Sequence, residues 1–211
     1  MQRLIEGVHR FRHDAFGNYR KLFRKLSKEG QNPHTLFITC SDSRVLAELI
    51  TQSKPGDLFV VKNIGNIVPL ATATGDTNST AAAIEFAVEN LRVNDIVICG
   101  HSQCGAISAL LGRTPLKDTT PHLSGWLKLA QPVLETLKKD YAHLKAEELE
   151  TAAGEENVLY GLDNLHSYPC VQERLGDGSL RLHAWFFKIA TAELFAYDPE
   201  TRQFTPLVSD Q

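Results

Sequence analysis

Two short apolar runs, each followed by cysteine or histidine, constrain the fold of this chain more than any other feature. The run at 35–39 leads directly into Cys40, and the run at 95–99 leads into His101 and Cys104. Short apolar runs bounded by polar or glycine residues are typical of strands buried in a parallel sheet. In open α/β sheets, functional side chains gather where such strands end. The two runs therefore predict two buried strands with a site at their carboxyl ends.

Helical and extended patterns alternate along the rest of the chain. Apolar residues at helical spacing precede Gly30, so residues 1–30 are predicted to form an N-terminal helical arm. Further strands are expected at 58–61, 180–185 and 193–197, the last as an antiparallel edge strand. Short helices are expected at 45–50 and 81–91, a loop at 71–80, and a helical stretch at 121–166 that is broken near Gly154.

This alternation predicts an α/β fold with a central, mainly parallel sheet, an antiparallel edge strand and flanking helices. We expect one domain spanning residues 1–211, since no composition shift marks a boundary. A net charge of −3 gives no reason to expect nucleic acid as a partner. No apolar run approaches the roughly 18 residues of a membrane span, and the N-terminus lacks a signal-peptide core. We therefore expect a cytoplasmic protein without a membrane partner.

Cys40, His101 and Cys104 have the chemistry of zinc ligands. Two thiolates and one imidazole leave the fourth tetrahedral position open, which is typical of catalytic zinc. Cys104 is predicted near a helix N-terminus, where the helix dipole favours the thiolate. The alternative is that the cysteines are small buried hydrophobic residues. That alternative explains neither His101 nor the charged residues beside Cys40.

Asp42 and Arg44 follow Cys40 at intervals of two residues. If the backbone stays extended, all three side chains share one side; in a helix, Asp42 would turn away from the other two. The extended conformation lets Arg44 hold the Asp42 carboxylate through a bidentate pair, which lowers the pKa of Asp42 and fixes its direction.

The segments Cys-Ser-Asp-Ser-Arg at 40–44, Asn-Ile-Gly-Asn at 63–66 and Cys-Gly-His-Ser-Gln-Cys-Gly at 99–105 occur in this order. Together they resemble the β-class carbonic anhydrases, and the similarity runs through nearly the whole chain. It is nearest to the bacterial cyanate-operon type and the cyanobacterial carboxysomal type. A carboxysomal location is therefore the alternative to the cytoplasm if the source is a cyanobacterium.

The resemblance implies reversible hydration of carbon dioxide to bicarbonate and a proton by a zinc-bound hydroxide. It implies Zn²⁺ on Cys40, His101 and Cys104, and a catalytic dyad of Asp42 and Arg44. In the family's closed states the aspartate takes the open zinc position, so we expect activity to fall at lower pH. The resemblance also implies a homodimer or a larger homo-oligomer such as a tetramer, with the N-terminal helix wrapping the neighbouring subunit.

The chain departs from the family pattern at a few positions. Lys62 stands where the family usually has arginine, and Phe37 and Phe187 stand where members with a second, inhibitory bicarbonate pocket have tryptophan and tyrosine. Because lysine replaces arginine poorly in bidentate recognition, we predict no such pocket here. Lys62 itself is otherwise interpreted as a surface or interface cation.

Two other functions stay open. One is hydrolysis of carbonyl sulfide or carbon disulfide, which uses the same zinc set in relatives of this fold. The other is a catalytically degenerate, zinc-stabilised assembly protein.

Other residues are not expected to take part in the chemistry. Cys99 is expected in the core, Trp126 is expected to be a packing residue, and His183 is expected to be structural. Asn63 and Gly65 are expected to shape the wall of the site.

Overall fold

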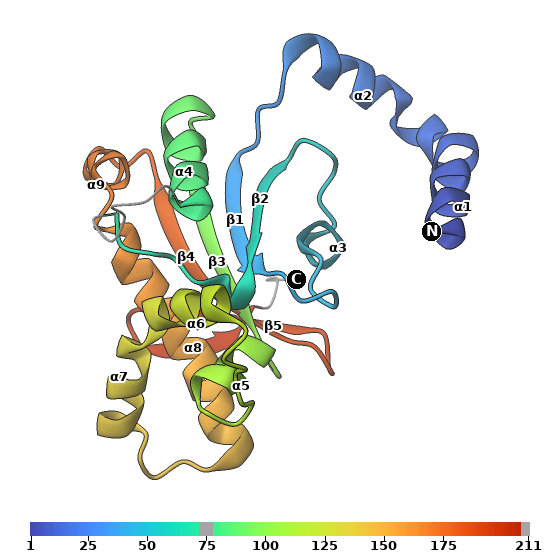
Figure 1. Ribbon diagram of the computed structural model, residues 1–211. Coiled ribbons are helices and arrows are strands. Elements are labelled where there is room, and N and C mark those ends of the chain that lie inside the picture. The colour runs from blue at the N-terminus through green and yellow to red at the C-terminus, as the bar shows by residue number, and fades with distance from the viewer. Residues whose placement is uncertain (72–77, 208–211) are drawn as a thin grey trace.

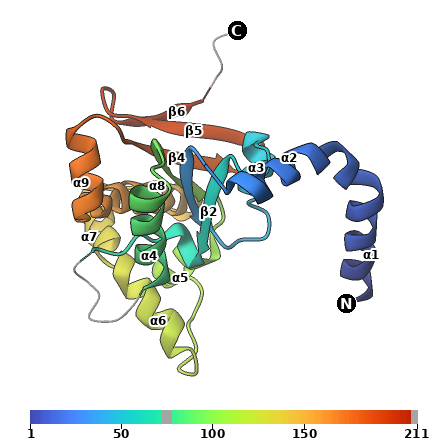
Figure 2. The same cartoon turned by 90° about the horizontal axis from the view of Figure 1, so that it is seen from above.

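A computed structural model describes residues 1–71 and 78–207 (Figures 1 and 2). Its centre is a six-stranded sheet in the order β2-β1-β3-β4-β5-β6. Strands β2, β1, β3 and β4 run parallel, and β5 and β6 are added antiparallel at one side. The strands are β1 (Thr35–Cys40), β2 (Leu58–Asn63), β3 (Asp95–His101), β4 (Arg181–Lys188), β5 (Glu193–Asp198) and β6 (Gln203–Pro206). The predicted α/β class with a mainly parallel sheet is confirmed.

Alternate side chains of the central strands enter different cores, as strand geometry requires. Leu36 and Ile38 of β1 face a large core on the side covered by α4 (Ser79–Glu85), α8 (Ala146–Leu165) and α9 (Pro169–Gly176). Phe37 faces a smaller core on the opposite side, where α3 (Ala47–Thr51) packs. A third cluster surrounds Cys40 and Cys104, and it includes residues of α5 (Gly105–Leu110), α6 (Pro121–Leu127) and α7 (Pro132–Asp140).

The N-terminal arm extends away from the sheet and its covering helices in both views (Figures 1 and 2). It consists of α1 (Gln2–Arg10), a π-helical turn (Phe11–Ala15) and α2 (Phe16–Glu29). Gly30 ends α2 with a φ of 85°, a left-handed conformation that glycine adopts at little cost. None of the residues in these three segments is buried within the chain.

The prediction of a break near Gly154 is wrong. Helix α8 runs without interruption through Gly154, and the polypeptide instead leaves the helical conformation between α7 and α8. A Cβ at position 154 would lie 2.8 Å from a ring carbon of Phe186. The glycine therefore serves the close approach of α8 to the sheet and does not end a helix.

The edge of the sheet and the start of one helix also differ from expectation. Strand β5 is not the edge, because the short strand β6 pairs outside it. Within the loop expected at 71–80, α4 already begins at Ser79, where the Asn78 side chain caps the helix by accepting from the N–H groups of Thr80 and Ala81. Residues 72–77 of that loop lie outside the described part of the chain.

In the ranges 1–71 and 78–207, no helix is both long and apolar enough to cross a membrane.

Candidate metal centre

The sheet order places the two predicted motifs side by side. The chain moves from β1 to β2 on one side and returns to β3 on the other, so β1 and β3 meet at the point where the strand order reverses. Cys40 is the last residue of β1 and His101 is the last residue of β3. Ligand sites in open α/β sheets form at this switch point, outside the carboxyl ends of the strands.

Cys104 reaches the same place through a tight turn after β3. Gln103 has a φ of 55° in this turn, and Cys104 then occupies the N-cap position of α5. The three predicted ligands are all buried, and their ligand atoms lie within 4.8 Å of one another. The structure therefore brings together residues that are far apart in the sequence.

The distances fit a tetrahedral zinc ion. The Sγ atoms of Cys40 and Cys104 are 3.9 Å apart. Two thiolates at the usual Zn–S distance in a tetrahedron are about 3.8 Å apart. Their separation is thus already suited to a shared metal.

The environment of His101 provides an independent test of this fit. Its Nδ1 lies 2.9 Å from the carbonyl oxygen of Ser102, and because a carbonyl only accepts, Nδ1 carries the proton. The other nitrogen, Nε2, is buried and has no hydrogen-bond partner among the described residues. A buried nitrogen lone pair without a partner is costly, whereas a metal ligand has this arrangement. The residues present fit a zinc ion bound through Sγ, Sγ and Nε2.

The two thiols are electrostatically linked. Hydrogen bonding to Cys104 lowers the pKa of Cys40, and burial acts in the opposite direction. The interaction with the Cys40 sulfur and burial both raise the pKa of Cys104. Two adjacent buried thiolates repel each other, so a cation between them would stabilise both.

Asp42 and Arg44 form the predicted pair beside these ligands. The backbone N–H and Nε of Arg44 donate to Oδ1 of Asp42 at 2.9 and 3.0 Å, and Nη2 donates to Oδ2 at 2.8 Å. The Arg44 side chain therefore holds the pKa of Asp42 well below its usual value. Oδ2 of Asp42 is 4.0 Å from Nε2 of His101, so the carboxylate lies next to the candidate ligands.

Comparisons with known proteins show the family of this chain. Residues 35–194 match the family model described as carbonic anhydrase. A carbonic anhydrase of Synechocystis sp. is 45% identical over 204 residues, which cover 97% of this chain and 73% of that protein. The chain belongs to the β-class carbonic anhydrases.

Solved structures place it within the same class. The structure of the β-carbonic anhydrase CcaA matches with a TM-score of 0.94 and 44% identity, covering all of this chain and 93% of the other. One of two tetrameric β-carbonic anhydrases from Sordaria macrospora matches with a TM-score of 0.80 and 29% identity, covering 93% and 97% of the two chains. The chain is therefore an enzyme of the carbonic anhydrase family.

Sequence reasoning missed how the turn after β2 supports this β-carbonic anhydrase site. The indole N–H of Trp126 donates to the carbonyl oxygen of Ile64 at 2.7 Å. The N–H of Gly65, in the same peptide group, interacts with the Cys40 sulfur and lowers its pKa. Asn157 of α8 donates to the carbonyl oxygen of Gly65 at 2.9 Å. Trp126 thus does more than pack, and no local pattern in the sequence marks either partner.

Asn63 closes the same turn. Its Oδ1 accepts from the N–H of Ile67, and its Nδ2 donates to the carbonyl of Ile67, both at 2.9 Å. Gly65 has a φ of 78°, and a Cβ there would lie 2.9 Å from the Cβ of Ala106. Both residues therefore shape the turn that passes beside Cys40, and their role in the wall of an active site stays a prediction.

Residues predicted to lie outside the site do so. Cys99 is fully buried in β3, and burial raises the pKa of its thiol to about 12. His183 bonds Asp95 at 2.8 Å, at the start of β3, and is therefore at the opposite end of the sheet from His101. Neither Cys99 nor His183 therefore lies among the candidate zinc ligands.

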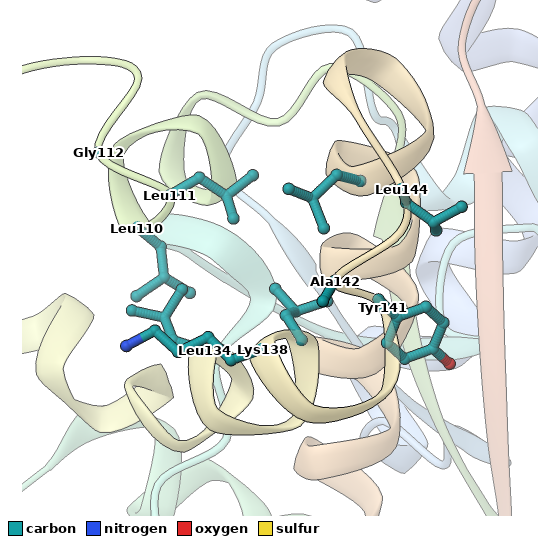
Figure 3. Close-up of a pocket in the computed structure, with 10 residues that line it drawn as sticks. Leu110, Leu111, Gly112, Leu134, Lys138, Tyr141, Ala142 and Leu144 are labelled. Atoms are coloured by element: carbon teal, nitrogen blue, oxygen red, sulfur yellow. The ribbon is translucent and has the colours of Figure 1, made fainter.

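A separate apolar cavity of about 470 Å³ lies between α5, α7 and the start of α8 (Figure 3). Leucine side chains from these elements face the cavity, and the Tyr141 hydroxyl points away from them to donate to Glu156 at 2.7 Å. The cavity contains none of the candidate ligands. Its walls offer little acid–base chemistry, so it does not compete with the Cys40 site as a reaction centre.

Proposed function

We propose that this β-carbonic anhydrase hydrates carbon dioxide reversibly to bicarbonate and a proton, with zinc held by Cys40, His101 and Cys104. The observation that carries the proposal is the buried Nε2 of His101, which has no hydrogen-bond partner in the ranges 1–71 and 78–207 and lies near two cysteine sulfurs 3.9 Å apart. When bound, zinc lowers the pKa of its water ligand and so supplies hydroxide near neutral pH.

The protein's own contribution begins with the ligand set. His101 binds in its neutral form, because the Ser102 carbonyl fixes the proton on Nδ1. Two thiolates balance the +2 charge of the metal, so the site is a weaker acidifying centre than one made of neutral ligands. A neighbouring group that orients the reacting water therefore matters more here.

Asp42 is placed for this role. Because Arg44 lowers its pKa, Asp42 is a carboxylate at neutral pH and can only accept hydrogen bonds. Its Oδ2 atom lies beside the His101 nitrogen and can accept a hydrogen bond from the reacting water, which would orient the water oxygen toward carbon dioxide. Arg44 keeps the carboxylate in this position through its bidentate bond, and it is tied to the second motif by donating to the Gln103 carbonyl at 3.1 Å.

The names of the similar proteins favour carbon dioxide as the substrate over carbonyl sulfide or carbon disulfide, since each is called a carbonic anhydrase. The assembled ligands and the intact Asp42–Arg44 pair weigh against a degenerate assembly protein. Parallel assays of carbon dioxide hydration and carbonyl sulfide hydrolysis distinguish the two enzymatic functions.

We also propose that the chain acts as a homo-oligomer. Leu4 and Val8 of the arm are 68% and 65% exposed, and neighbouring apolar residues are exposed as well. Contiguous exposed apolar surface usually marks a contact with another protein. The Sordaria macrospora enzymes are tetrameric, and sedimentation tests whether this chain forms a dimer or a tetramer. A cytoplasmic location remains our expectation, and cell fractionation tests it.

Zinc content and carbon dioxide hydration in Cys40→Ser test the main proposal. We expect both to fall sharply, because a serine hydroxyl is a poor zinc ligand. Cys170→Ser is the matched control, since Cys170 is also buried but lies in α9. If Cys40→Ser retains both zinc and turnover, the site assignment is wrong.

A further inference from the structure

Lys62 is exposed, and its ammonium group bonds two backbone carbonyls of the loop that follows β1. Its ammonium group donates to the carbonyl oxygen of Val45 at 2.6 Å and to that of Asp42 at 3.2 Å. Lys62 lies on β2, opposite Thr39 in the register of β1, and so reaches across the strand end to the loop that follows Cys40. Hydrogen bonds from a charged donor are stronger than those between neutral groups.

This loop carries the Asp42–Arg44 pair, and Arg44 also ties it to the turn after β3 by donating to the Gln103 carbonyl at 3.1 Å. The N–H of Ser41 donates to the Asn63 carbonyl at 2.8 Å, and the N–H of Val45 donates to the Asp42 carbonyl at 3.2 Å. Val45 is fully buried, so its carbonyl is a fixed point for Lys62. Lys62 thus adds a bond at the Asp42 carbonyl to the bonds that Arg44 makes with the Asp42 carboxylate.

The position of Asp42 relative to His101 makes this restraint important. Its Oδ2 is only 4.0 Å from the nitrogen that would bind zinc. A small movement of the loop would bring the carboxylate into the fourth ligand position, where it would exclude water. Two carbonyls that accept from one ammonium group on a neighbouring strand oppose such a movement.

We propose that Lys62 is a positioning residue that fixes the backbone of residues 42–45 and so keeps the Asp42 carboxylate on Arg44 and away from the metal. The inference rests on the proposed function, because it concerns access to the same metal. Two of the three N–H donors of the ammonium group are engaged with backbone carbonyls of this loop, which is the contact that the proposal uses.

The test uses Lys62→Met, which retains much of the side-chain length and removes the charge. The matched control is Lys54→Met, whose ammonium makes no hydrogen bond or ion pair with a residue in the ranges 1–71 and 78–207. We expect Lys62→Met to bind zinc normally while its kcat falls roughly tenfold, as for other changes in groups that support metal sites. Lys54→Met should match the wild type.

Cobalt(II) in place of zinc gives a readout independent of turnover, because its visible spectrum reports the ligand set. We expect Lys62→Met to change this spectrum and the added change Asp42→Asn to abolish the difference. If Lys62→Met has the spectrum and the kcat of the wild type, the proposal is overturned. It is also overturned if Lys62→Met changes the spectrum equally in a protein that already carries Asp42→Asn. Lys62→Gln replaces Lys62→Met if the latter does not fold, and the same outcomes apply.

These results are distinguishable from a failure of the proposed function. If the wild-type protein neither binds metal nor hydrates carbon dioxide, the proposed function itself is overturned. An active, zinc-loaded wild type with an unaltered Lys62→Met variant overturns only the role of Lys62.

Discussion

Asn157 and Asn164 offer a matched test of how α8 supports the candidate metal centre. They lie seven positions, or about two helical turns, apart on the same helix face. They are 2% and 3% exposed, and each donates from Nδ2 to a carbonyl of the segment after β2. Asn157 bonds the Gly65 carbonyl at 2.9 Å and Asn164 bonds the Val68 carbonyl at 2.8 Å. Gly65 also contacts the Cys40 sulfur.

Replacement by leucine removes the donor and retains a side chain of similar size. In each variant a buried carbonyl loses its partner, which costs about 1–3 kcal/mol. Removal of the buried amide offsets part of this cost, so we expect each variant to lose about 2 kcal/mol in the free energy of unfolding. Only Asn157→Leu frees the turn that contacts Cys40, and we expect its zinc affinity to fall roughly tenfold.

Urea unfolding of the metal-free proteins measures the first effect, and competition with a chromophoric chelator measures the second. The reasoning is refuted if Asn157→Leu unfolds like the wild type, because the hydrogen bond would then contribute nothing. It is also refuted if both variants lose zinc affinity equally, because the effect would then not be local to the Gly65 turn.

Three further outcomes are expected. Gly154→Ala should destabilise the protein by about 1 kcal/mol, because overpacking against Phe186 outweighs the higher helix propensity of alanine. In the control Gly125→Ala, the added Cβ would meet no atom within 4 Å, so this variant should be neutral or stabilising. Thermal unfolding measures both effects. Burial raises the pKa of Glu155 from 4.5 to about 7, so the folded state binds a proton between these values and stability falls as the pH rises through about 7. Glu155→Gln should therefore gain stability over the wild type at pH 8 and not at pH 4, and parallel stability curves for the two proteins would contradict this. Removal of zinc by a chelator should lower the free energy of unfolding by about 4 kcal/mol for a metal present at a thousand times its Kd, and an unchanged Tm would contradict binding to the folded state.

Much of the site could be predicted because its information is local. The buried runs at 35–39 and 95–99 identify β1 and β3 through their apolar residues alone. The interval of two between Asp42 and Arg44 determines that they can pair, since no distant part of the chain is needed to bring them together. The arm could be predicted as helical up to Gly30 for the same reason, since periodicity and a glycine stop are properties of a short segment.

Other features depended on contacts with distant residues, which no local sequence pattern predicts. Gly154 was expected to break a helix because glycine has low helix propensity, but the ring of Phe186 occupies the space where a side chain would lie. The four residues of β6 carry too weak an alternation to be recognised without β5 beside them. Lys62 is exposed, as expected for a surface cation, but its contacts could not be predicted, because its acceptors are backbone carbonyls that sequence alone cannot locate.

The sequence by itself determined the chemistry of this protein, since the ligand types, the charged pair and the strands that carry them can all be recognised from short segments. Only the tertiary structure decided that these groups form one centre. Cys40 and Cys104 are 64 residues apart, and their sulfurs come within 3.9 Å because β1 and β3 pair in parallel and end at the same edge. The supports from Lys62, Trp126 and Asn157 were likewise decided by packing, because a hydrogen bond to a backbone carbonyl depends on where the chain passes and not on which residue it carries.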